Sequence, residues 1–111
     1  MARLPRLTVP GYPHHVIQRG NNRQACFGSD EDFAAYAHWL EEYAVKFRVA
    51  IHAWVFMTNH VHLLLSPETD EGVSRLMQTL GRKYVRYFNY TYKRSGTLWE
   101  GRFKSCVVEA E

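Results

Sequence analysis

Hydrophobic residues along this chain follow two spacings, and both predict regular structure. Apolar residues recur every three or four positions over residues 30–47 and 73–94, so each segment is predicted to form an amphipathic helix. Runs rich in β-branched and aromatic residues predict strands at residues 14–19, 49–57, 60–66 and 98–108. The last strand is expected to break near Gly101. The run VAIHAWVFM (49–57) predicts a strand buried on both faces.

In chain order these segments read β-α-β-β-α-β, which is the order of a ferredoxin-like α+β fold. In that arrangement a four-stranded antiparallel sheet carries both helices on one face and leaves the other face open to a ligand. Three prolines and a glycine interrupt regular structure among the first 13 residues, which predicts an extended arm. The length of 111 residues suits a single domain spanning residues 1–111.

Composition favours a globular, cytoplasmic protein. Hydrophobic residues make up 46% of the chain and charged residues 23%, which are ordinary values for a globular domain. No apolar run approaches the ~18 residues of a membrane span, so no membrane association is expected. Cys26 and Cys106 are far apart and form no CxxC motif, which argues against a disulfide framework.

Charge is distributed unevenly along the chain, although the net value is only +3. The first 24 residues contain four arginines and no acidic residue, and residues 72–106 contain eight basic residues and one acidic residue. Most acidic residues lie between these two segments. The pattern predicts a basic surface built from both ends of the chain, suited to a polyanion such as nucleic acid. The alternative is a solvated surface whose charge is merely uneven.

Two histidines in the third predicted strand carry the most informative chemistry. Residues two apart in a strand point to the same face, so His60 and His62 are predicted to lie side by side on the open face. Val61, between them, is predicted to point under the helices. Two neutral imidazoles so close together make half of a site for a divalent metal. The alternative is a pair of half-exposed histidines without a function.

Three separated segments are distinctive: HHVIQRGNNR (14–23), TNHVHLLLSP (58–67) and SGTLWEGRFKS (95–105). Together they resemble the REP-associated tyrosine transposases, which belong to the HUH single-tyrosine class. The resemblance implies an enzyme that binds single-stranded or hairpin DNA, then cleaves and transfers a strand through a 5′-phosphotyrosine. It also implies Mg²⁺ or Mn²⁺, held by His60 and His62, that activates the scissile phosphate.

The residues alone and the family resemblance point to different positions for the nucleophile. Among the tyrosines, Tyr90 is favoured by position alone, because it falls beside Lys83 and Arg86 on the basic side of the second helix. The family instead places its nucleophile on a further helix after the WxxRF segment, here residues 99–103, where no position of this sequence matches. We therefore expect the chain to lack that helix and to bind DNA while cleaving it poorly.

Basic and amide side chains form three groups that are predicted to bind DNA. They lie after the first strand, on the second helix and in the last predicted strand: Arg19, Asn21, Asn22 and Arg23; Arg82, Lys83 and Arg86; Arg102 and Lys104. Trp99 and Phe103 offer aromatic surfaces for unpaired bases, although Trp99 is expected to belong to the core.

The other histidines are assigned structural roles: His14, His15, His38 and His52. One exception is left open, because His14 or His15 would neighbour the metal if the first strand pairs centrally. A different class of function also remains open, namely a non-catalytic module that binds single-stranded nucleic acid on a ferredoxin-like sheet. A third alternative is a decayed remnant without present activity. The sequence is compatible with a monomer or a homodimer.

Overall fold

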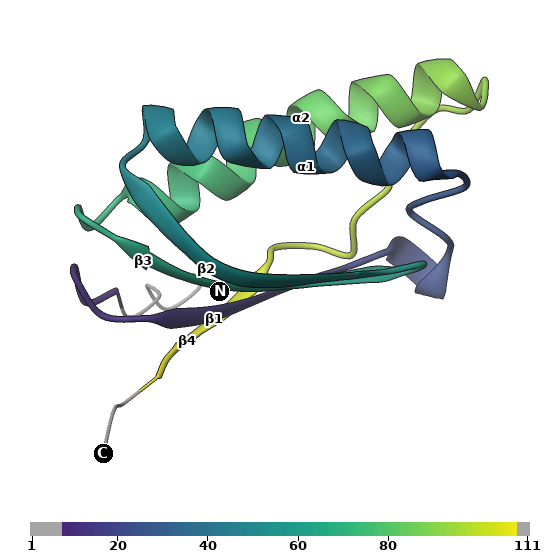
Figure 1. Ribbon diagram of the computed structural model, residues 1–111. Coiled ribbons are helices and arrows are strands. Elements are labelled where there is room, and N and C mark those ends of the chain that lie inside the picture. The colour runs from purple at the N-terminus through teal and green to yellow at the C-terminus, as the bar shows by residue number, and fades with distance from the viewer. Residues whose placement is uncertain (1–7, 109–111) are drawn as a thin grey trace.

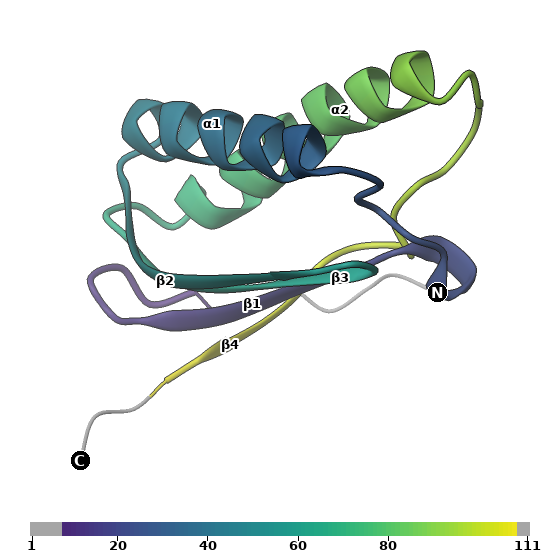
Figure 2. The ribbon, with the colours of Figure 1, turned by 45° about the vertical axis from the view of Figure 1, so that its right-hand side comes forward.

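Two helices cover one face of a four-stranded antiparallel sheet (Figures 1 and 2). This computed structural model describes residues 8–108, so most of the predicted arm lies outside the described residues. In chain order the elements are β1 (His14–Arg19), the 3₁₀ turn η1 (Asn21–Arg23), α1 (Asp30–Lys46), β2 (Val49–Met57), β3 (His60–Pro67), α2 (Gly72–Thr91) and β4 (Lys104–Val107). The arrangement confirms the predicted α+β, ferredoxin-like class. Among the described helices, none is both long and apolar enough to cross a membrane.

The two central strands decide which side chains reach each face of the sheet. The strand order is β2-β3-β1-β4, and the β1–β3 register pairs Ile17 with His62 and Arg19 with His60. Opposed residues of an antiparallel pair project to the same face. Burial alternates along both strands, so Val61 is fully buried beneath the helices while its two neighbours are not. The predicted placement of His60 and His62 on the open face is confirmed.

An aromatic cluster fills the space between the helices and the sheet. Tyr36 of α1 and Tyr84 of α2 are buried with ring centroids 5.2 Å apart, and the Trp99 ring lies 6.2 Å and 6.0 Å from them. The Tyr84 hydroxyl donates a 2.5 Å hydrogen bond to the carbonyl oxygen of Cys26. Burial raises the pKa of both tyrosines. Both tyrosines pack in the core between the helices and the sheet.

A buried carboxylate joins the two helices. Asp32, in the first turn of α1, accepts a 2.6 Å hydrogen bond from the Tyr87 hydroxyl of α2 and another from the Tyr92 hydroxyl. The backbone N–H of Gly28 donates to the same carboxylate over 2.7 Å. Burial alone would raise the pKa of Asp32, but the hydrogen bonds outweigh it and lower the pKa. The charged carboxylate therefore ties the start of α1 to the end of α2.

Two boundaries near the end of the chain differ from the prediction. Helix α2 ends at Thr91 rather than at residue 94, because Lys93 adopts a left-handed φ of 52° just after the cap. The last strand is reduced to Lys104–Val107, and Gly101, with a φ of 57°, lies in the break that precedes it. Only an isolated bridge between Gly20 and Trp99 remains of its first half.

The prediction that residues 49–57 are buried on both faces is wrong. These residues form β2, which lies at the edge of the sheet and pairs only with β3. Trp54 is 58% exposed and Val55 is 52% exposed, so neither face of this strand is fully covered. An apolar run cannot by itself distinguish an edge strand from a central one.

Replacing Asp32 with Asn is expected to destabilise the fold by about 2 kcal/mol near neutral pH, because hydrogen bonds to a charged acceptor are lost. The folded pKa lies below the ordinary value of 3.8, so this stabilisation is complete above that value and is lost as the pH falls through the folded pKa. Urea unfolding should therefore show the gap between the variant and the original protein closing below pH 4. Asp30→Asn, at an exposed position of the same turn, is the control, and an equal loss in both variants would contradict the assignment.

Candidate functional site

The centre of the candidate site is a pair of histidines on the open face of β3. The ring centroids of His60 and His62 are 4.9 Å apart, with an interplanar angle of 78°. Both side chains are partly exposed, and both rings can be reached from solvent. The alternation of β3, in which every second residue is buried, produces this geometry directly.

Asn59 decides which nitrogen of His60 is available. Its Oδ1 atom lies 2.8 Å from Nδ1 of His60, and a carboxamide oxygen can only accept, so Nδ1 carries the proton. The lone pair of the neutral imidazole therefore lies on Nε2. Within the described residues, Nε2 has no hydrogen-bond partner, which leaves it free for a ligand. This is the orientation that a second residue commonly imposes on a metal-binding histidine.

A third histidine joins the pair from the neighbouring strand. Nε2 of His15 lies 3.0 Å from Nδ1 of His62, and the two rings stack with centroids 5.2 Å apart. Burial lowers the pKa of His62, and the nearby His60, His15 and Arg19 lower it further. His62 is therefore neutral at pH 7, the form in which an imidazole binds a metal.

The position of His15 settles an alternative that the sequence leaves open. Side chains alternate along β1, so His14 projects beneath the helices and His15 projects to the open face. His14 is fully buried, where Nε2 accepts from the N–H of Val9 and Nδ1 therefore donates to the carbonyl of Tyr12. His14 is therefore buried away from the histidine pair, whereas His15 lies beside His62. The alternating pattern of HHVIQR predicts that His15 faces the same side as His62, provided that β1 is known to pair with β3.

Positive and amide groups surround the histidines on the same face. Arg19 is opposite His60 in the register, and Lys104 continues the row that begins with His62 and Ile17. The η1 turn (Asn21–Arg23) lies beside the β2–β3 hairpin, where Asn59 donates to the carbonyl oxygen of Arg23 over 3.5 Å. The structure thus places Arg19 and Lys104 on the histidine side of the sheet and the η1 turn beside the hairpin that leads into His60.

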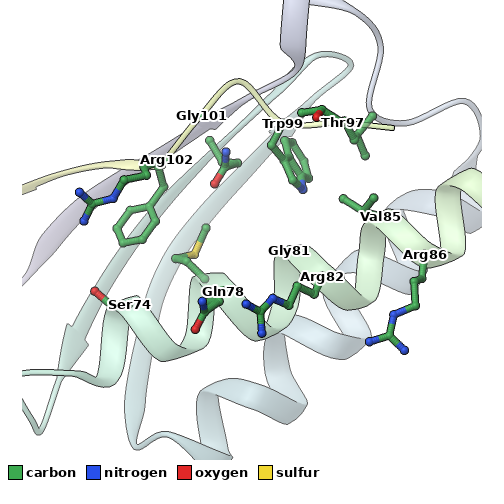
Figure 3. Close-up of a pocket in the computed structure, with 14 residues that line it drawn as sticks. Ser74, Gln78, Gly81, Arg82, Val85, Arg86, Thr97, Trp99, Gly101 and Arg102 are labelled. Atoms are coloured by element: carbon green, nitrogen blue, oxygen red, sulfur yellow. The ribbon is translucent and has the colours of Figure 1, made fainter. Parts of the chain in front are cut away.

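A second basic group lies on the helix side. Arg82 and Arg86 of α2 and Arg102 line a cavity of about 740 Å³ between α2 and residues 97–103 (Figure 3). Trp99 and Phe103 line the same cavity. Trp99 is 8% exposed and belongs to the core, as predicted. The predicted DNA-binding residues therefore form two surfaces on opposite sides of the sheet.

Two predicted site residues are not brought to either surface. Lys83 leaves the cavity side of α2, because its Nζ lies 5.4 Å from the ring centroid of Trp39 on α1. Tyr90 is 87% exposed on α2, in the helix layer, whereas His60 and His62 are on the opposite face of the sheet. The structure does not place Tyr90 beside the histidines.

The histidine pair fits half of a divalent metal site. His60 and His62 offer two imidazole nitrogen ligands, and no described residue hydrogen-bonds to Nε2 of either ring. Within residues 8–108, no group of three or more His, Cys, Asp or Glu side chains is arranged to hold a metal ion. Water and phosphate oxygens, which Mg²⁺ and Mn²⁺ accept readily, are among the ligands that could complete such a site.

Comparisons with known proteins identify a family and agree with the fold. Residues 8–111 match the family described as IS200-like transposases. The fold is similar to the structure of a REP-associated tyrosine transposase bound to a REP hairpin, with a TM-score of 0.71 and 18% identity over 100% of this chain and 64% of that one. It is also similar to a candidate transposase from Deinococcus radiodurans R1, with a TM-score of 0.71 and 19% identity over 97% and 87% of the two chains. No curated protein matches the chain.

We expect His62 to titrate below the ordinary histidine value of 6.5 in the folded protein without divalent metal. Burial and the neighbouring positive groups both disfavour the imidazolium, so the midpoint should move back to the ordinary value when the chain is unfolded in urea. NMR titration of the imidazole carbon protons in EDTA measures both midpoints. A folded midpoint at or above the unfolded one would contradict the described contacts.

Proposed function

Because the chain belongs to the IS200-like transposase family, we propose that it binds single-stranded or hairpin DNA across the open face of the sheet, in the cytoplasm. The observation that carries this proposal is the row of His62, Ile17 and Lys104 beside the pair of His60 and Arg19. Two metal-binding imidazoles and two cations on one face match the needs of a phosphodiester, which is anionic and must be neutralised and oriented.

His60 and His62 would hold a divalent cation, Mg²⁺ or Mn²⁺, through Nε2. A cation held there would neutralise a scissile phosphate and make it easier for a nucleophile to attack. The protein's own contribution is orientation. Asn59 keeps the proton of His60 on Nδ1. We propose that His15 accepts the Nδ1 proton of His62, which would leave the Nε2 lone pair of both rings available for the cation.

Strand cleavage and transfer through a 5′-phosphotyrosine further require a tyrosine hydroxyl next to the bound phosphate. A phenolate is a better leaving group than an alkoxide, so such a link stores the energy needed to reseal the strand. The tyrosines of α1 and α2 lie in the helix layer, and burial raises the pKa of Tyr36 and Tyr84 still further. We propose that residues 8–108 supply DNA binding and phosphate activation, and that a tyrosine from outside these two helices acts as the nucleophile.

The alternative of a non-catalytic nucleic-acid-binding module makes a different prediction about metal. Such a module would bind DNA equally well with EDTA and with Mn²⁺, and substitutions at His60 and His62 would leave the DNA affinity unchanged. The hydrogen bonds that leave both Nε2 atoms available favour the metal-dependent proposal.

Mn²⁺ binding, followed by electron paramagnetic resonance, tests the histidine assignments. His62→Leu should abolish specific binding, and His15→Leu should weaken it by about tenfold or more, because the acceptor that orients His62 is lost. His15→Gln should recover most of the affinity, since a carboxamide oxygen can accept the same proton. His52→Leu is the control, because His52 is exposed and bonds to Ser66 away from the site. Unchanged affinity in His15→Leu would contradict the orienting role.

Binding of a DNA hairpin tests the open face. Arg19→Gln should weaken binding several-fold and reduce the slope of log affinity against log salt by about one, because one phosphate contact is removed. Fluorescence anisotropy at several salt concentrations measures both quantities. Arg75→Gln is a matched control, since Arg75 is exposed and paired with Glu71 at 2.7 Å on α2. Equal losses in the two variants would show that Arg19 contributes only general charge.

A further inference from the structure

The cavity beside α2 is lined by a largely buried glutamine whose carboxamide has no partner among the described residues. Gln18 of β1 projects to the helix side, is 8% exposed and lines the cavity. Its carboxamide makes no hydrogen bond to any described residue. The carboxamide is therefore available to a ligand that enters the cavity.

A second unpaired group lies in the lining of the same cavity. Nε1 of Trp99 is buried and has no hydrogen-bond partner among the described residues. The indole lies over Gly81 of α2, where a Cβ atom would come within 3.8 Å of Nε1. The absence of a side chain at Gly81 keeps the space beside the indole open. An unpaired indole N–H and an unpaired carboxamide thus line the same open cavity.

Positive charge surrounds this space. Arg82 and Arg86 extend from α2 on one side, and Arg102 lies on the opposite side, after the bridge at Trp99 (Figure 3). None of the three guanidinium groups is paired with a carboxylate among the described residues. A volume of about 740 Å³ falls within the range of sites that bind small organic groups. The lining therefore suits a planar, hydrogen-bonding group that is attached to an anion.

A nucleotide has this chemistry. We propose that the cavity binds one unpaired nucleotide of the DNA strand, with Gln18 hydrogen-bonded to the edge of the base and the arginines bound to its phosphate. A carboxamide both donates and accepts, which matches the adjacent donors and acceptors on a base edge. This inference rests on the proposed DNA binding and extends it to the other face of the sheet.

Two adjacent residues of β1 face the two surfaces. Arg19 lies on the open face, whereas Gln18, the preceding residue of β1, faces the cavity. At this point β4 has already ended, because its pairing with β1 stops at Ile17 and Lys104. A single strand that leaves the histidines can therefore turn around the chain at residues 100–103 and place one base behind the sheet.

Three hairpins with the same duplex test this inference: one blunt, one with a short single-stranded tail, and one whose tail has abasic sites in place of bases. The original protein should bind the base-containing tail about tenfold more tightly than the abasic tail, because only the former supplies a base. Gln18→Met should remove this difference while the affinity for the blunt hairpin stays unchanged. Free deoxynucleoside monophosphates, titrated separately, show whether the cavity requires the nucleotide to be part of a strand.

The thermal stability of Gln18→Met provides an independent test. Because the Gln18 carboxamide lacks a partner in the free protein, Gln18→Met should leave the thermal midpoint unchanged or raise it. A clear fall in the midpoint would assign Gln18 a structural role and overturn the inference, as would a base-dependent difference that persists in Gln18→Met. Failure of the original protein to bind any hairpin would instead reject the proposed DNA binding and the inference with it. Binding of all three hairpins with equal affinity would reject the inference alone.

Discussion

The register between β1 and β3 is the constraint on which the rest of the structure depends. Pairing Ile17 with His62 places His15, Arg19, His60 and His62 on one face of the sheet. Since side chains alternate along a strand, a shift of one residue would move a whole set to the other face. The buried alternation of Val16, Val61 and their neighbours disfavours any such shift, because it would expose the core. Hydrophobic burial thus orients the polar site.

The two helices stabilise this arrangement by packing on the buried face of the sheet. Their aromatic cluster packs against this face, and the carboxylate of Asp32 joins α1 to the end of α2 through two tyrosine hydroxyls. The Asp32 carboxylate and the two hydroxyls that bond to it are paired with one another. The cavity beside α2 differs, because Gln18 and the indole N–H of Trp99 have no hydrogen-bond partner among the described residues. The contrast between paired and unpaired polar groups distinguishes the contact that joins the helices from the cavity proposed to bind a ligand.

Much of the fold could be predicted from sequence periodicity, because local spacing decides which face a residue joins. The two-residue alternation in HVHLLLS correctly separated His60 and His62 from Val61. The strand order is not local information, so the exposure of Trp54 on an edge strand was missed. The end of α2 was also missed, since the left-handed residue is Lys93 and not the glycine that usually takes this role. The role of His15 depends on β1 lying next to β3, and the unpaired amide of Gln18 becomes visible only once its surroundings are known.

The most direct test of this account is the set of nuclear Overhauser effects from the imidazole ring protons of His62. The account predicts contacts between these protons and the ring protons of His15 and His60, with none to the methyl groups of Leu76 or Leu80 in α2. Contacts to those methyl groups would place His62 beneath the helices. That result would contradict the register, the histidine site and the separation of the two surfaces together.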